Sequence, residues 1–201
     1  MERSQPVSGS ATDRIDAARS EQYRFLSRMF SAAPNAATLQ GIAQLKGDQT
    51  ALGQAFDALA RQADGADPRL VEREFFELFI GVGRGELLPY ASFYLTGFLN
   101  ERPLADLRRD LIALGVARAE GRHEPEDHIA LLFEVMADMA DGTLPVSAEQ
   151  QADFFRQHIA PWAAQFMDDL AVAPSARLYR PLAEIGRLVV DIESRAFALA
   201  A

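Results

Sequence analysis

The sequence contains no cysteine, and this absence removes several kinds of chemistry at once. Disulfide bridges, thiolate metal ligands and thiol nucleophiles are all excluded. Histidine is scarce as well, with three imidazoles in the chain, His123, His128 and His158. A ferritin-like di-iron bundle needs two Glu-x-x-His pairs, whereas this chain has one, at 120–123, with Gly121 inside it. We therefore expect no metal site.

Motifs of catalysis and of membrane insertion are also missing. No Gly-x-Ser-x-Gly nucleophile elbow occurs, and the glycines at 81, 83 and 85 lack the lysine of a phosphate-binding loop. No segment approaches the roughly 18 apolar residues of a membrane span, and residues 1–13 lack the apolar run of an export signal. We expect no enzyme activity, no catalytic residue, no cofactor and no membrane insertion. A nucleotide- or small-molecule-binding protein that uses the glycine-rich loop is the alternative.

Positive charge is in short supply. Acidic residues number 29 against 20 basic ones, which gives a formal net charge of −9. Nucleic acids and anionic membranes require a basic surface, so the sequence predicts that neither is a ligand.

Apolar residues, in contrast, are abundant and recur with helical spacing. They make up 49% of the 201 residues, enough for one domain with a sizeable core. No segment shows convincing strand alternation. We predict a single all-α domain over 1–201, a bundle of about eight to ten helices, with 1–12 as a flexible tail. The expected helices cover residues 13–31, 34–47, 49–63, 68–81, 103–114, 125–141, 148 onward with a break at Pro161, and 178–199.

Residues 81–94 are predicted to form an irregular segment, because three glycines and Pro89 interrupt helix. A loop of this length is usually functional or disordered, and its aromatic rings argue against disorder. For Phe93 and Tyr94, anchoring to the core and contact with a ligand are equally good interpretations. For Tyr90 we favour contact with a ligand.

Acidic residues concentrate in the segment 120–141, where seven carboxylates accompany one arginine, Arg122. Pro125 suits the first position of a helix, which would place two acids, Glu126 and Asp127, in a first turn that favours anions. Such a surface is either a solvated acidic face or the docking site of a cationic partner. His128 is expected to join the loop to this helix and to hold Asp127 in place.

The last predicted helix carries an apolar stripe with steps of three and four residues. This stripe indicates either burial against sister helices or a coiled-coil seam. The second interpretation would make the chain a dimerising scaffold. The stripe consists of Leu178, Leu182, Ile185, Val189, Ile192, Ala196 and Leu199.

Three motifs resemble those of the TorD/DmsD/NarJ family of chaperones, which mature molybdenum-containing redox enzymes. The first joins Glu74-Phe75-Phe76-Glu77-Leu78-Phe79-Ile80-Gly81 to Leu88-Pro89-Tyr90-Ala91-Ser92-Phe93-Tyr94-Leu95. The second is Glu124-Pro125-Glu126-Asp127-His128-Ile129, the most specific of the three. The third is His158-Ile159-Ala160-Pro161-Trp162, followed by Leu178-Tyr179-Arg180 and Leu182-Ala183. The run 95–104 is similar to the branch that accompanies formate dehydrogenases.

The resemblance implies a cytoplasmic binding protein. Its partners would be the twin-arginine leader and the body of a molybdoenzyme catalytic subunit, which it would hold before export. The chaperone itself would be a monomer or a homodimer. Guanidinium groups pair well with carboxylates, and an apolar stretch would lie along aromatic rings. The residues expected to bind the peptide are Tyr90, Ser92, Phe93, Tyr94, Phe98, Glu101, Glu124, Glu126, Asp127 and His128.

Overall fold

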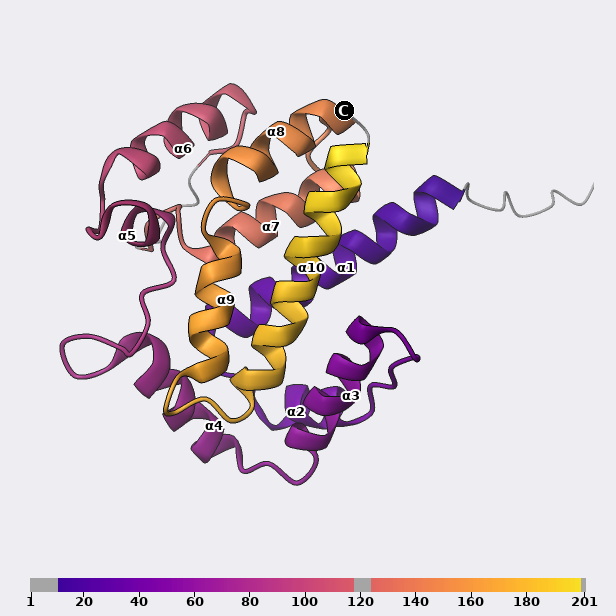
Figure 1. The fold of residues 1–201 in the computed structure, drawn as a ribbon, viewed down its shortest axis with the longest axis vertical. Coiled ribbons are helices and arrows are strands. Elements are labelled where there is room, and N and C mark those ends of the chain that lie inside the picture. The colour runs from indigo at the N-terminus through magenta and orange to yellow at the C-terminus, as the bar shows by residue number, and fades with distance from the viewer. Residues whose placement is uncertain (1–10, 118–123, 200–201) are drawn as a thin grey trace, which may run out of the picture.

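The computed structural model describes residues 11–117 and 124–199, and within these ranges it is helical without any strand (Figure 1). This confirms the predicted all-α fold. The helices are α1 (Ala11–Ser31), α2 (Ala36–Ala43), α3 (Ala51–Ala63), α4 (Pro68–Phe75), the π-helical segment η1 (Phe76–Ile80), α5 (Ala91–Thr96), α6 (Arg102–Ala113), α7 (Ile129–Ala140), α8 (Ala148–His158), α9 (Ala163–Val172) and α10 (Tyr179–Leu199). Of the predicted tail, 1–10 lie outside the described residues, and 11 and 12 are already helical. No helix in the described ranges is long and apolar enough to cross a bilayer.

Several helices begin where the sequence supplies a capping side chain. Asn35, Thr50 and Asp67 each accept a hydrogen bond from a backbone N–H of the first turn. Ser147 and Gln150 form a reciprocal capping box at the start of α8. The predicted break at Pro161 is confirmed, because α8 ends at His158 and α9 begins at Ala163.

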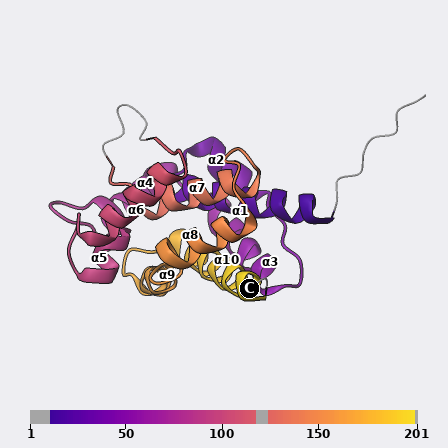
Figure 2. The same ribbon diagram turned by 90° about the horizontal axis from the view of Figure 1, so that it is seen from above.

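The helices form two layers, which Figure 2 shows from above. One layer contains α8, α9 and α10, and the other contains α1, α4, α6 and α7. The closest partners are α1 with α7, and α10 with α9 and α3.

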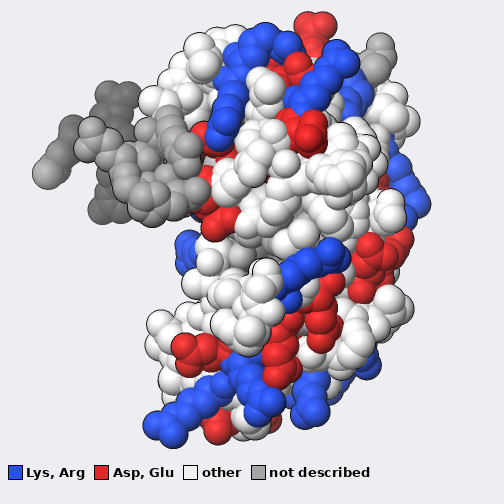
Figure 3. All heavy atoms as spheres, turned by 90° about the vertical axis from the view of Figure 1, so that its left-hand side faces the viewer, with Lys and Arg blue, Asp and Glu red and all other residues white. Residues whose placement is uncertain are grey.

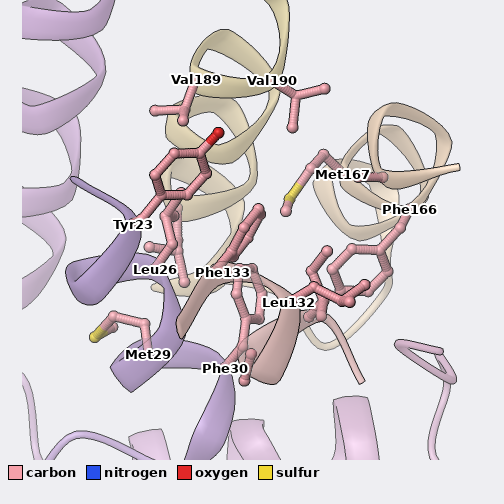
Figure 4. Close-up of a cluster of buried hydrophobic side chains, with 14 of the residues drawn as sticks. Tyr23, Leu26, Met29, Phe30, Leu132, Phe133, Phe166, Met167, Val189 and Val190 are labelled. Atoms are coloured by element: carbon pink, nitrogen blue, oxygen red, sulfur yellow. The ribbon is translucent and has the colours of Figure 1, made fainter. Parts of the chain in front are cut away.

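The core fills the space between the layers (Figure 4). Apolar side chains of α1 and α7 meet those of α9 and α10 there, and all are nearly or fully buried. Each such side chain contributes about 1.5–3 kcal/mol when fully buried. The labelled members are Tyr23, Leu26, Met29, Phe30, Leu132, Phe133, Phe166, Met167, Val189 and Val190.

A buried carboxylate joins α4 to the start of α10. Glu74 is 7% exposed, and its oxygens accept hydrogen bonds from the backbone N–H groups of Arg177 (2.7 Å), Leu178 (3.2 Å) and Tyr179 (2.9 Å). These groups lie at a helix N-terminus, where they have no intrahelical partner. The first and third family motifs therefore meet inside the molecule.

Two segments differ from the sequence prediction. The end of the predicted irregular segment is helix α5, which begins at Ala91. The acidic motif precedes α7 instead of forming its first turn, because His128 is the N-cap and Pro125 lies in a turn that accepts the His128 N–H. The helix-dipole explanation for Glu126 and Asp127 is therefore wrong.

The last helix confirms burial for the first part of its predicted stripe. Val189 and the stripe residues before it are buried, whereas Ile192 is 47% and Leu199 is 89% exposed. In the second part Glu193 turns inward instead, where it pairs with Arg19 at 2.8 Å.

Glu74→Ala leaves three backbone N–H groups without their acceptor. We expect it to lower the free energy of unfolding by at least about 2 kcal/mol, since hydrogen bonds to charged groups contribute about 1.5–3 kcal/mol each. Glu72→Ala, at an exposed position of the same helix, is the matched control and should change it by less than about 0.5 kcal/mol. Urea unfolding measures both. Equal stabilities for the two variants would contradict the role assigned to Glu74.

Candidate functional site

The site is built on a junction between residues 89–92 and 127–129. Tyr90 and His128 form an isolated antiparallel β-bridge. On either side of it, Ala91 N donates to Asp127 O (3.0 Å) and Ile129 N donates to Pro89 O (2.9 Å). We call this set of backbone contacts the clamp. It brings the aromatic motif and the acidic motif into one structural unit.

Asp127 lies in the interior of the clamp. It is fully buried, and its Oδ2 accepts a hydrogen bond from Ser92 N at the start of α5 (2.8 Å). Its Oδ1 and the Ser92 hydroxyl are buried without a hydrogen-bond partner. In this conformation neither side chain is accessible to a ligand, so Asp127, which was expected to bind the peptide, instead positions the start of α5.

His128 fixes the other side of the clamp. Its Nδ1 accepts a hydrogen bond from Ala130 N (3.2 Å) as the N-cap of α7, and its ring meets that of Tyr90 edge-on at 5.1 Å. Burial lowers the pKa of His128 to about 4, although the nearby carboxylates Glu124 and Asp127 act in the opposite direction. The imidazole is therefore neutral at pH 7, as its capping role requires.

Next to the clamp lies a cavity of about 540 Å3, which we call the aromatic cavity. It opens between α1, α4 with η1, and α7, and it combines aromatic rings with two carboxylates, Glu124 and Glu134. The rings are those of Phe30, Phe75, Phe79 and Tyr90.

Tyr90 contributes to both the aromatic and the acidic part of this cavity. Its ring lines the cavity and its hydroxyl donates a hydrogen bond to Glu124. Burial, together with this hydrogen bond, raises the pKa of Tyr90 well above its usual value. The arrangement offers an apolar floor and an acidic edge, which suits a cationic and apolar ligand.

A second cavity of about 470 Å3 lies on the other side of α7, between α6 and α7. We call it the α6–α7 cavity. Glu126 lines it, is 8% exposed, and forms an ion pair with Arg108 at 2.7 Å. Glu124 and Glu134 border both cavities.

The remaining predicted residues lie outside the aromatic cavity. Tyr94 anchors α5 to α9: its hydroxyl donates to Asp169 (3.1 Å) and its ring lies against Trp162. The Arg84 guanidinium covers the Phe93 ring at 5.3 Å. Phe98 is 69% exposed, and Glu101 is exposed where α6 begins. The contacts of Tyr94 are those expected from its anchoring interpretation.

Figure 3 views the molecule from the side of α5 and α6. Uncharged atoms form a band between two groups of charged side chains, and acidic side chains gather at its edge beside the residues drawn in grey. No cluster of metal-binding side chains occurs in the described parts of the chain.

The glycine-rich loop has a structural explanation. A Cβ at Gly81 would lie 2.0 Å from Arg84 O, and one at Gly85 would lie 2.6 Å from Leu78 O. Gly81 also has a positive φ of 62°. The turn itself therefore requires these two glycines.

Sequence reasoning missed several residues of the aromatic cavity. Phe30 and Phe79 have the spacing of core residues, and in the fold Phe30 is indeed buried at the wall of the cavity while Phe79 is half-buried there. Glu134 carried a usable signal, because it is one of the seven carboxylates of the acidic segment 120–141. The missed lining residues are Phe30, Ser31, Phe75, Phe79, Ile80, Ala130, Leu131 and Glu134.

Comparison with known proteins now identifies the family. The family model described as nitrate reductase delta subunit matches residues 45–168. The chain belongs to this family. It is 30% identical over 157 residues to a chaperone protein TorD of Vibrio cholerae, which covers 73% of this chain and 71% of that protein. A TorD chaperone of Vibrio parahaemolyticus is 28% identical over 141 residues, covering 65% and 66%. The resemblance to the TorD/DmsD/NarJ family is confirmed.

A solved structure supports the fold assignment. The crystal structure described as that of a redox enzyme maturation protein from Archaeoglobus fulgidus aligns with a TM-score of 0.54. The alignment covers 94% of this chain and 99% of that one, at 15% identity. At this identity the likeness establishes a shared fold.

The buried neutral His128 predicts a pH-dependent stability. Its folded pKa of about 4 lies below the unfolded value of about 6.5, so the unfolded state binds a proton first as the pH falls. The free energy of unfolding should drop by about 2 kcal/mol between pH 7 and pH 5 from this group. In His128→Asn, whose amide can still cap α7, that part of the drop should vanish. Urea unfolding at both pH values measures it; an unchanged drop in the variant would contradict the assignment.

Proposed function

We propose that this protein is a cytoplasmic chaperone for the maturation of a molybdenum-cofactor redox enzyme, and that it holds the enzyme's twin-arginine leader in the aromatic cavity. The observation that carries the proposal is the meeting of four aromatic rings with Glu124 and Glu134 around one cavity of about 540 Å3. A leader presents the matching chemistry, two arginines followed by an apolar stretch. The names of the relatives point in the same direction.

The arginine pair is assigned to the edge formed by Glu124 and Glu134. Each carboxylate has two oxygens and accepts about four hydrogen bonds, so a partner within the chain does not exhaust it. Guanidinium and carboxylate have matching fork geometry. Tyr90 holds Glu124 at this edge through its hydroxyl.

The apolar stretch of the leader is assigned to the cavity itself. Exposed ion pairs contribute about 0–1 kcal/mol each, whereas micromolar affinity requires about 8 kcal/mol. Burial of apolar surface, at about 25 cal/mol per Å2, must therefore supply most of the affinity. The carboxylates set specificity and the rate of encounter.

The predicted site residues other than Tyr94, which anchors α5, divide into four groups under this proposal. Tyr90 and Glu124 contact the leader, while Ser92, Asp127 and His128 position them through the clamp. Glu126 borders the adjacent α6–α7 cavity. Phe93, Phe98 and Glu101, outside the aromatic cavity, are assigned to the body of the client enzyme. The formate dehydrogenase branch stays a prediction.

Glu124→Lys with Glu134→Lys should weaken binding of a synthetic twin-arginine leader peptide by at least tenfold, about 1.4 kcal/mol. It should also flatten the salt dependence of the Kd, because the attraction of opposite charges is lost. Calorimetry at two salt concentrations measures both effects.

The matched control is Glu72→Lys with Glu184→Lys, which makes the same charge change at exposed positions outside both cavities. Equal losses in the two double variants would show a general charge effect and remove Glu124 and Glu134 from the site.

Tyr90→Ala should weaken binding of the same peptide more than Glu124→Gln does. The loss of apolar contact in Tyr90→Ala should cost about 2 kcal/mol of binding free energy. The loss of an ion pair in Glu124→Gln should cost at most about 1 kcal/mol. Tyr90→Phe retains the ring, so it separates ring contact from the hydrogen bond to Glu124 and should bind nearly as well as the wild type. A greater loss in Glu124→Gln than in Tyr90→Ala would reverse the ranking of apolar over charged contacts.

A further inference from the structure

The α6–α7 cavity continues the aromatic cavity across the outer face of α7. Three residues, Glu124, Leu131 and Glu134, line both. On α7, Ala130 lines only the aromatic cavity and Val135 lines only the α6–α7 cavity. Leu131 and Glu134 are one helical turn apart, so they form a ridge between the cavities.

The lining of the α6–α7 cavity is more apolar than the ridge, and two of its acidic side chains are paired with arginines. Its floor is apolar, with Leu111 and Ile112 from α6 facing Val135. Two of the carboxylates that line it are already neutralised by arginines of this chain: Glu126 pairs with Arg108 at 2.7 Å and Asp138 pairs with Arg24 at 2.8 Å. The cavity therefore suits an apolar side chain better than a further cation.

We infer that the α6–α7 cavity receives an apolar side chain of the same peptide, located on the N-terminal side of the arginine pair. The inference rests on the proposed function, in which the apolar stretch after the pair occupies the aromatic cavity. The arginine pair then lies over Glu134 on the ridge and over Glu124, which lines both cavities beside it. Charge complementarity at the ridge and the shared lining residues make the two cavities one continuous binding surface.

The width of α7 sets the number of peptide residues between the side chains that occupy the two cavities. A helix with its side chains is about 10–12 Å across, and an extended chain advances about 3.3 Å per residue. About three or four residues thus cross α7. An apolar residue placed three or four positions before the first residue of the aromatic-cavity stretch would reach the α6–α7 cavity.

Two synthetic peptides test this assignment on the full chain. Both contain the arginine pair and the apolar stretch after it. One has leucine at the position immediately before the pair, and the other has serine there. The wild type should bind the leucine peptide about tenfold more tightly, about 1.4 kcal/mol, by calorimetry.

The protein variants are Ile112→Asn in the α6–α7 cavity and Ile80→Asn in the aromatic cavity. Ile112 is 75% and Ile80 is 53% exposed, so both substitutions are compatible with folding, and neither changes the net charge. Val172→Asn, at a 78% exposed position lining neither cavity, is the matched control. Ile112→Asn should abolish the advantage of the leucine peptide and leave binding of the serine peptide unchanged. Ile80→Asn should weaken both peptides equally.

Equal binding of the two peptides by the wild type, with Ile112→Asn changing neither, would overturn this inference and leave the proposed function standing. Equal weakening of both peptides by Ile112→Asn would also overturn it, because the cavity would then hold another part of the ligand. Failure of the wild type to bind either peptide would overturn the proposed function as well.

Discussion

The clamp between residues 89–92 and 127–129 is the constraint on which the site depends. Its hydrogen bonds join segments that lie more than thirty positions apart in the sequence. The Asp127 side chain is fully buried and accepts a hydrogen bond at the start of α5. The neutral His128 ring caps α7. Their effect is to place the Tyr90 ring and the Glu124 carboxylate at the edge of one cavity.

A second buried carboxylate extends this arrangement. Glu74 fixes the start of α10 against α4, and the Tyr179 ring then packs against Phe75 and Phe79 at 6.0 and 5.3 Å. These two phenylalanines line the aromatic cavity. Glu74, Asp127 and His128 are thus buried motif residues that position the lining of the aromatic cavity.

Local pattern predicted the helices well, because amphipathic spacing and capping residues act over a few positions. It failed at Glu126 and Asp127, where proline and acids resemble a helix start but the bridge to Tyr90 prevents one. It failed again at Ile192, which is exposed, because the neighbouring Glu193 is buried in its place and pairs with Arg19. Such contacts join residues far apart in the sequence, so no local pattern contains them.

The candidate site was predictable in part for the same reason. The pairing of an aromatic motif with an acidic motif follows from the sequence, and Tyr90 and Glu124 do meet. The cavity does not follow, because its walls come from α1, η1 and α7. Phe93 and Tyr94 follow Tyr90 closely, yet neither of these two residues of α5 lines the cavity.

Photo-crosslinking tests the central claim most directly. A twin-arginine leader peptide with a photoreactive residue immediately after the arginine pair is bound to the full chain, and the crosslinked sites are mapped by mass spectrometry. The account predicts crosslinks within residues 75–80 and 128–135. Crosslinks confined to α2 and α3, or none above those of a peptide without arginines, would contradict it.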